Sequence, residues 1–274
     1  MWKQSLIERT IRRFLLLVIV ICAIAPIVLI IMTSFKTRVD ALASPPVWFF
    51  KPTLSNYIEI FKAHNFKLFF YNSSVVAIVS TLVTVFIASL SAYGFARYSF
   101  RGKEGISYWI LSLRMAPPIA AIIPFFFLLR MVHLIDSRLG LIIVYININL
   151  PFAIWMLRGF FEDIPKELEE SAKVDGCTAL GSFFRIAIPL IKPGLAATTI
   201  LTFLFIWNEF LFALILTGWK AQTLPVAVTL FMRETGIDWG YLAAASTLMM
   251  IPAIMFTFLA QKGLVRGLTL GAIK

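Results

Sequence analysis

The chain has 274 residues, of which 60% are hydrophobic and only 14% are charged, and its mean hydropathy is +0.88. This apolar content exceeds that of an ordinary globular protein, so the composition predicts a membrane protein. The formal net charge of +11 could suggest nucleic-acid binding, but the Lys and Arg residues lie in short segments between apolar runs, which favours a membrane explanation.

Six apolar runs are long enough to cross a bilayer, because each crossing needs about 20 residues. They cover residues 14–34, 70–96, 107–130, 139–157, 195–217 and 241–261. We therefore expect an all-α membrane protein with one domain of six transmembrane helices over residues 14–261. Tails at residues 1–13 and 262–274 flank it. The first run follows basic residues as a signal peptide does, but it lacks a convincing cleavage site, so we expect it to be retained as an anchor.

The distribution of basic residues predicts the orientation of these spans. With a cytoplasmic N-terminus, the cytoplasmic segments contain 15 of the 25 Lys and Arg residues and the external segments contain 9, while Arg114 lies inside a span. This bias agrees with the positive-inside rule. Both termini and the polar loop between the fourth and fifth spans are therefore expected in the cytoplasm.

Residues 35–69 form the first external segment, in which three prolines exclude a continuous helix. A short interfacial helix is expected to begin near Ser55. In the third span, Pro117, Pro118 and Pro124 predict a kinked or locally opened backbone, which is tolerated only where protein or water satisfies the freed carbonyl groups. Arg114 precedes this break, and it could line an aqueous path or extend to the cytoplasmic surface.

Polar residues also occur within the fourth and fifth spans. Asn147 and Asn149 are two positions apart and face different directions, so they could serve a pathway or bond neighbouring helices. Glu209 is the one acid that we expect inside the hydrocarbon region, where an acid suggests function but could equally be a paired structural group. Asn208 could hold it by bonding an adjacent helix.

The loop at residues 158–194 contains the longest polar stretch of the chain. Asp163 is a candidate N-cap, and Gly176 lies where a helix usually stops, which predicts a short helix over residues 165–174. On this helix Leu168, Ser171, Ala172 and Asp175 share one face, whereas the other acids, Glu167, Glu169 and Glu170, point elsewhere.

A second short helix is expected after the glycine bend. Thr178 can cap its N-terminus, and Pro189 and Pro193 should prevent it from continuing. A surface helix with small residues on one face lets another protein approach closely. The alternative is an ordinary solvated loop.

This loop resembles the EAA motif of the membrane subunits of binding-protein-dependent ABC importers. The matching positions are Glu170, Ser171, Ala172, Asp175, Gly176, Ile186, Ile188 and Pro189. Ser171 stands where the motif has Ala and Ile188 where it has Leu, and both changes are mild. The ending Gly-Leu-Thr-Leu-Gly-Ala-Ile-Lys is similar to the carbohydrate, maltose-type branch of these permeases.

The resemblance implies the transmembrane domain of a type I importer in a bacterial inner membrane, with a carbohydrate or polyol as solute. Its partners would be a second homologous permease, two cytoplasmic ATPase subunits that bind ATP and Mg²⁺, an external solute-binding protein and membrane lipid. The chain itself would be no enzyme and would bind no cofactor, metal or nucleic acid. The EAA positions would contact the ATPase.

Polar groups near the middle of the membrane are candidates for solute contact, namely Asn147, Asn208 and Glu209. One alternative from another class is an ion-coupled secondary carrier or channel that uses Glu209 and Arg114 as an ion path. A second alternative is a membrane anchor or signalling subunit without transport. Cys22 lies in a span and Cys177 in the polar loop, so no disulfide is expected.

Overall fold

The computed structural model describes residues 6–233 and 236–270. These residues are almost entirely helical, which confirms the predicted all-α class; the pair β1–β2 is a two-residue antiparallel hairpin. The elements are α1 (Leu6–Ser34), α2 (Arg38–Leu42), α3 (Ser55–Ala63), α4 (Phe66–Arg97), α5 (Lys103–Ser112), η1 (Leu113–Met115), α6 (Pro118–Met131), α7 (Arg138–Glu162), α8 (Lys166–Val174), α9 (Ala179–Ser182), η2 (Phe183–Ala187), α10 (Ile188–Leu190), α11 (Lys192–Trp207), α12 (Leu211–Leu216), α13 (Leu224–Val228), η3 (Thr229–Phe231), β1 (Met232–Arg233), β2 (Gly236–Ile237) and α14 (Trp239–Leu270).

Four of the described helices are long and apolar enough to cross a membrane, namely α1, α4, α7 and α14. Two further candidates are bent pairs, which bring the number of spans to six if each pair crosses once. The two remaining predicted spans, the third and the fifth, are therefore the ones whose backbone is interrupted.

The third span breaks where the sequence predicts it. The direction of the helix changes by 95° between residues 103–115 and 118–131. Ala116 and Pro117 are extended between η1 and α6, because a residue before proline avoids the helical region and proline cannot donate the next hydrogen bond. Pro118 then begins α6, while Pro124 is accommodated inside it.

The fifth span differs from the prediction of one helix over residues 195–217. Helix α11 ends at Trp207, and α12 starts only at Leu211. At its other end α11 meets residues 179–190 at an angle of 80°. The prediction missed the break after Trp207 because no proline or glycine marks it in the sequence.

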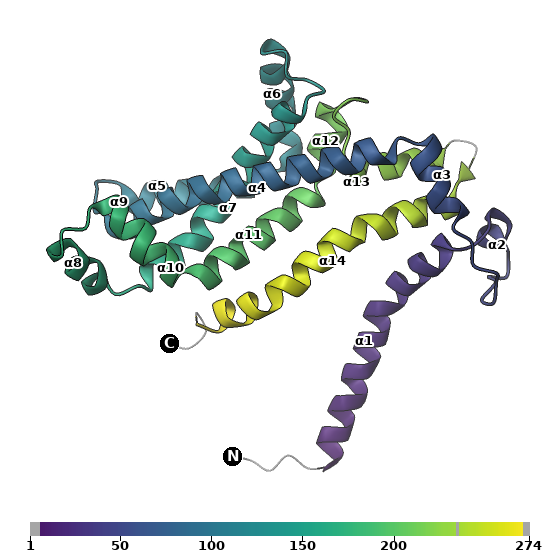
Figure 1. The fold of residues 1–274 in the computed structure, drawn as a ribbon, viewed down its shortest axis with the longest axis horizontal. Helices are drawn as coiled ribbons and strands as arrows, with labels where there is room; N and C mark the ends of the chain where they lie inside the picture. Colours follow the sequence, from purple (N-terminus) through teal and green to yellow (C-terminus); the bar gives the residue numbers. More distant parts are fainter. Residues whose placement is uncertain (1–5, 234–235, 271–274) are drawn as a thin grey trace. The chain divides into compact units, whose positions relative to one another are not determined.

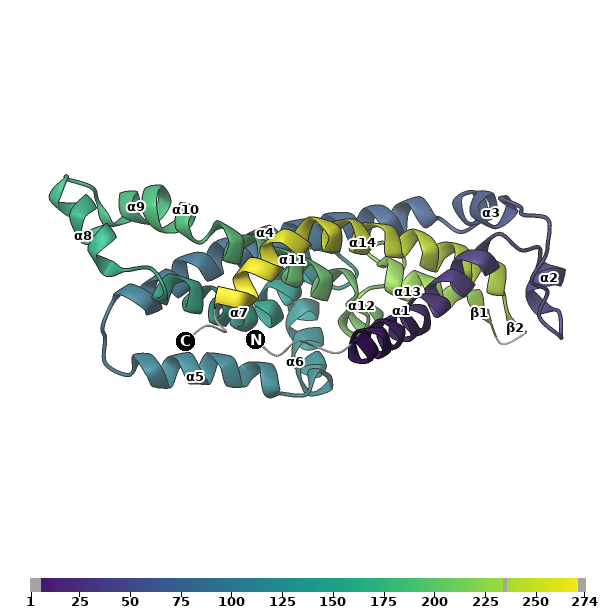
Figure 2. The ribbon, with the colours of Figure 1, turned by 90° about the horizontal axis from the view of Figure 1, so that it is seen from below.

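The chain divides into two compact units, of which the larger contains residues 67–226 and 252–274. Figure 1 shows α4, α7 and α11 alongside one another in this unit, with α8 and α9 beyond one end. Figure 2 shows α5 on one side of the unit and α8, α9 and α10 on the other. Small side chains on α4, including Ala88, Ala92 and Ala96, meet Ala153 and Leu157 of α7, so the two helices pack closely.

At the opposite end of this unit, the side chains of Asp136 and Asn72 form hydrogen bonds with backbone groups of the segment between α12 and α13. The Asp136 carboxylate accepts from the N–H groups of Gly218, Lys220 and Ala221, at 2.8 to 3.3 Å. The Asn72 amide donates to the carbonyl groups of Lys220 and Gln222 at 3.0 and 2.9 Å. The segment between α12 and α13 is therefore fastened both to α4 and to the turn before α7.

The smaller unit contains residues 1–66 and 227–251. The predicted short helix near Ser55 is present as α3, and its Asn56 amide donates to the carbonyl groups of Ser34 and Lys36, both at 2.8 Å. A Cβ on Gly240 would approach the Asn56 side chain to 2.7 Å, so a glycine is needed there. Asn56 thus joins the end of α1 to α3 and allows the start of α14 to pack closely.

The helices extend beyond the spans into the predicted tails. Helix α1 already begins at Leu6, and α14 continues to Leu270. Residues 1–5 and 271–274 of the expected tails lie outside the described residues. Pro26 lies inside α1 without ending it. Residues 10–31 of this apolar helix are all exposed.

Candidate functional site

The polar loop between α7 and α11 folds into two short helical segments that meet at Gly176. Gly176 has a φ of +82°, the left-handed conformation in which glycine commonly ends a helix. The Thr178 hydroxyl then accepts a hydrogen bond from the N–H of Gly181 and caps α9. The predicted stop and the predicted second cap are both confirmed.

One local prediction for this loop is wrong, and another is right only in part. Asp163 does not begin α8, because α7 continues through Glu162 and the Asp163 N–H bonds back to the carbonyl of Gly159 at 3.1 Å. Pro165 instead precedes α8. Pro189 and Pro193 were expected to stop the second helix: the helical stretch does end at Leu190, between them, but Pro189 itself lies inside it, because the π-helical turn η2 precedes α10.

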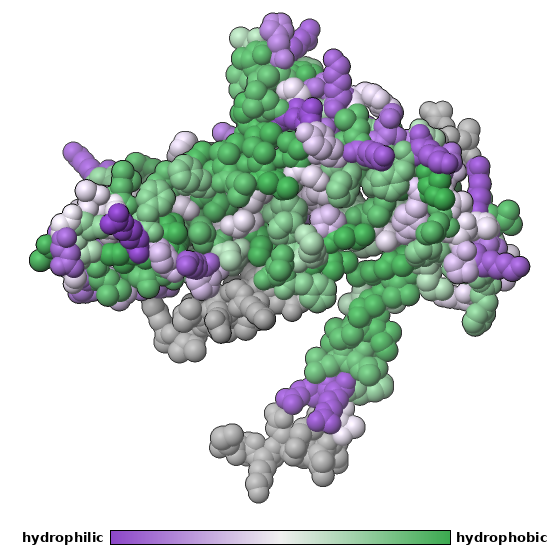
Figure 3. All heavy atoms as spheres, in the orientation of Figure 1, coloured by the Kyte–Doolittle hydropathy of each residue, from purple (hydrophilic) through white to green (hydrophobic). Residues whose placement is uncertain are grey.

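The residues that match the motif are mostly accessible in the folded chain. Glu170, Ser171, Asp175 and Gly176 are exposed, and Ala172 is half-buried. Large apolar side chains next to them are also exposed to solvent: Val174 is 89% exposed and Leu180 is 65% exposed. In Figure 3, hydrophilic residues gather around α8 and α9, whereas hydrophobic residues cover the long helices of the same unit. Small residues beside uncovered apolar ones suit contact with another protein.

Ile186, Ile188 and Pro189, the last motif positions, belong to the second helical segment. Ile186 and Ile188 are half-buried and Pro189 is exposed. The preceding Phe183 is buried and packs edge-on against the Tyr93 ring, with ring centroids 5.0 Å apart. This segment is therefore held to α4 by apolar packing.

The buried residue of α8 is Glu169, one of the acids expected to point away from the face of Leu168, Ser171 and Asp175. The Glu169 side chain is only 4% exposed and forms an ion pair with Arg97 of α4, with 2.6 Å between Oε1 and Nε. Its second oxygen accepts from the Tyr93 hydroxyl at 2.5 Å and from Ser182 at 3.5 Å. The Arg97 guanidinium also donates to the carbonyl of Ile164 at 3.2 Å. Glu169 thus joins α4, α8 and α9.

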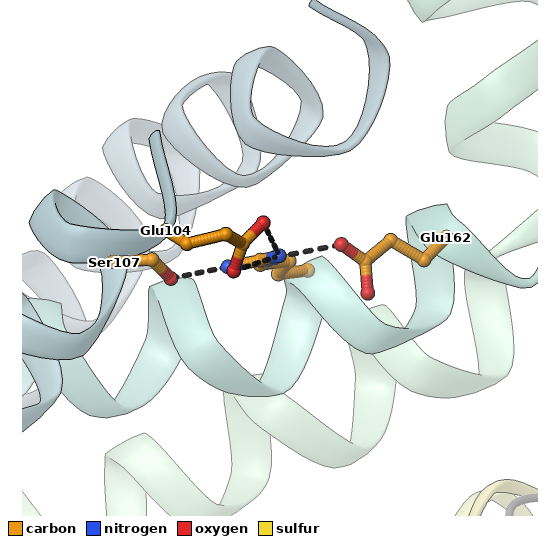
Figure 4. Close-up of polar contacts among 4 residues, drawn as sticks. Glu104, Ser107 and Glu162 are labelled. Atoms are coloured by element: carbon orange, nitrogen blue, oxygen red, sulfur yellow. Dashed lines mark hydrogen bonds and ion pairs between the residues drawn. The ribbon is translucent and has the colours of Figure 1, made fainter. Parts of the chain in front are cut away.

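A second ionic cluster lies at the same end of α7 but is more accessible. Arg158 forms ion pairs with Glu104 of α5 and with Glu162 on its own helix, at 2.9 and 2.7 Å, and donates to the Ser107 hydroxyl (Figure 4). The Glu104 and Glu162 side chains are 58% and 43% exposed. This cluster connects α5 to α7.

Glu209 lies in the break between α11 and α12. Its carboxylate accepts from the Tyr145 hydroxyl at 2.6 Å and from the N–H groups of Phe212 and Ala213 at 2.9 and 3.2 Å. These amides are free donors at the start of α12, so Glu209 caps this helix and fastens it to α7. Of the two interpretations of this acid, the contacts match the paired structural group.

The other two candidates for solute contact are exposed in the isolated chain. The Asn208 amide donates to the carbonyl of Leu204 on its own helix at 2.8 Å rather than to Glu209. Asn147 is exposed on α7, whereas Asn149 is buried and bonds to the carbonyl of Tyr145. The structure therefore brings none of the three candidates, Asn147, Asn208 and Glu209, into a shared hydrogen bond among the described contacts.

Arg114 turns toward the middle of the helices rather than toward their ends. Its guanidinium donates to the carbonyl of Ile148 in α7 at 3.3 Å. It also lies over the rings of Phe152 and Phe205, 5.1 and 4.9 Å from their centroids. Ile148 is well inside α7, so the contacts do not match an extension to the cytoplasmic surface. Cation–π contact partly compensates a charge in this position.

Comparisons with known proteins agree on one family. The model of the family described as "Binding-protein-dependent transport system inner membrane component" matches residues 84–270. The sulfoquinovosyl glycerol transport system permease protein SmoH of Agrobacterium fabrum is 35% identical over 94% of this chain and 91% of SmoH. The trehalose/maltose transport system permease protein MalG of Thermococcus litoralis is 34% identical over 97% of this chain and 99% of MalG. One chain of a bacterial ABC transporter involved in alginate import has the same fold, with a TM-score of 0.79 at 23% identity over 96% of this chain and 99% of that chain.

Proposed function

This chain belongs to the inner membrane components of binding-protein-dependent transport systems, and we propose that it couples a carbohydrate pathway to a separate cytoplasmic ATPase. The relatives named for sulfoquinovosyl glycerol and for trehalose and maltose support a carbohydrate as the solute. The segments on the side of the polar loop and the two termini contain 15 Lys and Arg residues, against 9 on the other side, which supports a cytoplasmic loop and cytoplasmic termini.

One observation is the main support for the coupling role, namely the exposed bend between α8 and α9. Two helical segments present small residues and uncovered apolar side chains around Gly176, and the sequence there matches the motif of the family. A protein partner that binds this bend can transmit its own movement, because the segment after it is packed against α4 through Phe183. Glu170, Ser171, Ala172, Asp175, Gly176, Ile186 and Pro189 form the proposed coupling residues.

The assembly that we propose follows from the family. A second homologous permease completes the pathway. Two ATPase subunits bind ATP and Mg²⁺ on the cytoplasmic side, and an external solute-binding protein delivers the solute. The exposed apolar stretch of α1, residues 10–31, is consistent with lipid or a second permease around this helix. For solute contact we propose Asn147 and Asn208, which are exposed polar groups within the spans. Glu209 is the weakest candidate, because three hydrogen bonds already occupy its carboxylate.

The coupling role is tested by substitutions at the bend. Gly176→Pro cannot keep a φ of +82°, since proline fixes φ near −65°, so the bend must change its course. We expect this variant to lose solute uptake while the ATPase still hydrolyses ATP. Asp175→Ala, which removes an exposed carboxylate beside the bend, should reduce uptake in the same direction. The measurement is solute uptake per ATP hydrolysed by the complete transporter in proteoliposomes.

Arg101→Gln provides a matched control, because this exposed residue lies in the short turn between α4 and α5, outside the proposed coupling residues. It should keep the uptake of the unaltered transporter. Full uptake by both bend variants would contradict the proposal. Flux through the permease alone, driven by an ion gradient, would instead support the ion-coupled carrier, which no finding favours at present.

A further inference from the structure

We propose that Glu169 is a positioning residue whose ion pair with Arg97 transmits the movement of α8 directly to α4. This inference rests on the proposed coupling of α8 to an ATPase. It goes further because Glu169 lies on the inner side of α8, away from the exposed motif residues. There it links α8 to Arg97 of α4, which is 72 positions earlier in the sequence.

Helix α8 is held by polar contacts rather than by apolar packing. Glu169 is the residue that the structure buries in α8, and neighbouring Leu168 is 47% exposed. A hydrophobic contact tolerates sliding, because it has no direction, whereas a buried ion pair requires defined positions of both partners. The orientation of α8 relative to α4 is therefore determined chiefly by this carboxylate.

Both groups of the pair make further hydrogen bonds. One carboxylate oxygen accepts from Arg97, and the other accepts from Tyr93, which lies one helical turn earlier on the same face of α4. Arg97 donates in addition to the carbonyl of Ile164, just before α8 begins. The guanidinium thus holds the chain at the start of α8 and again at Glu169, so that α8 cannot rotate without breaking one of these bonds.

The side chains of the pair are 4% and 9% exposed, which makes the loss of one partner more disruptive than the loss of a surface pair. A buried charge without its partner is strongly unfavourable, and local structure changes to expose it to water. In a Glu169→Gln variant we therefore expect α8 to leave its position against α4. The ATPase can still bind the exposed bend, but its movement no longer reaches the span.

The experiment measures three quantities for the complete transporter in proteoliposomes: the ATPase retained per permease, the rate of ATP hydrolysis and the solute taken up per ATP. Glu169→Gln and Arg97→Gln should each lower uptake per ATP more than about tenfold, with the ATPase still assembled. The double variant should be no worse than either single variant, because all three break one connection. The exchanged pair, Glu169→Arg with Arg97→Glu, should recover part of the uptake.

Glu162→Gln is the matched control. It removes another Glu–Arg ion pair at the same end of the bundle, but that pair lies within α7, is partly exposed and leaves Arg158 paired with Glu104. This variant should keep uptake per ATP. Tyr93→Phe is a milder test for the case in which the charge variants do not fold. It keeps the ring against Phe161 and Phe183, removes one hydrogen bond to the carboxylate, and should lower uptake per ATP about threefold.

The possible outcomes separate this inference from the proposed function. Normal uptake per ATP in Glu169→Gln, with Gly176→Pro uncoupled, overturns the positioning role alone. Normal uptake in both variants overturns the proposed function and the positioning role together. A loss of uptake that only follows a loss of assembled ATPase, in Tyr93→Phe as well as in the charge variants, also overturns the inference, because it assigns Glu169 to stability.

Discussion

At the scale of single residues, Glu209 shows how an acid within a membrane segment can be structural. Its carboxylate caps the start of α12 and accepts from a tyrosine of α7, so its hydrogen-bonding capacity is largely used. Because these hydrogen bonds occupy the carboxylate, the structure does not support the hypothesis of an ion path through Glu209. The same arrangement also explains why α11 can end at Trp207 inside an apolar region: the amides that the break frees have a partner.

We predict that Glu209→Ala lowers the stability of the protein by about 1–2 kcal/mol, the usual cost of losing a helix cap. Thermal unfolding of the purified permease in detergent measures the effect. Asn147→Ala serves as the comparison, because Asn147 is exposed and has no described contact to lose; it should unfold normally and lower solute uptake instead. An unchanged unfolding temperature for Glu209→Ala would contradict the capping role.

The sequence predicts single residues well where the cause is local. Gly176 and Thr178 were identified correctly, because a left-handed glycine and a capping hydroxyl act on atoms within four positions of themselves. The partner of Glu169 was not predicted, since nothing in one sequence links an acid in a loop helix to Arg97 of a distant span. Only the fold brings them together.

At the scale of elements, the same distinction separates the two broken spans. The break of the third span follows from Pro117 and Pro118, and it was predicted. The break after Trp207 depends on Glu209 and Tyr145 from another helix, so the sequence suggested one continuous helix instead. The π-helical turn before Pro189 was likewise missed, because a helix can absorb a proline when its hydrogen bonds shift by one residue.

The crossing of α7 and α11 offers a prediction about packing. A Cβ on Gly194 would approach the Phe160 ring to 2.3 Å, so Gly194→Ala should destabilise the permease by about 1–3 kcal/mol through overpacking. Gly94→Ala on α4 is the control, since no atom lies within 4 Å of its Cβ position. It should be neutral or slightly stabilising, because alanine favours helices more than glycine does. The measurement is the thermal unfolding temperature of both variants. Equal changes in this temperature would contradict the close packing of Gly194 against Phe160.

At the scale of the whole molecule, the sequence predicted the helical class and the family, while its count of six spans holds only if each of the two bent pairs crosses once. These depend on summed hydropathy and on one motif with fixed spacing, both of which tolerate errors in single positions. The exact ends of the helices were less predictable. Helix α14 passes the expected end of the last span and reaches Leu270, because no proline or cap stops it there.

The proposed orientation can be measured with single cysteines in a background that lacks Cys22 and Cys177. Arg101→Cys, in the turn after α4, should react with a membrane-impermeant maleimide in inverted vesicles and be protected in intact spheroplasts. Lys51→Cys, in the segment before α3, should show the opposite pattern. Both positions are exposed, so access depends on the side of the membrane. Labelling of Arg101→Cys in intact spheroplasts would place the motif outside the cell and remove the proposed function.

Asp136 has a consequence for how the larger unit can deform. Its carboxylate gathers three backbone amides at one extremity of the bundle, while Glu169 joins helices at the other. Helices that are linked by hydrogen bonds or ion pairs near both ends of the bundle resist sliding past one another. We therefore expect α4 to tilt together with the start of α7 at one end and with α8 and α9 at the other, with bending confined to the chain segments outside these two contacts.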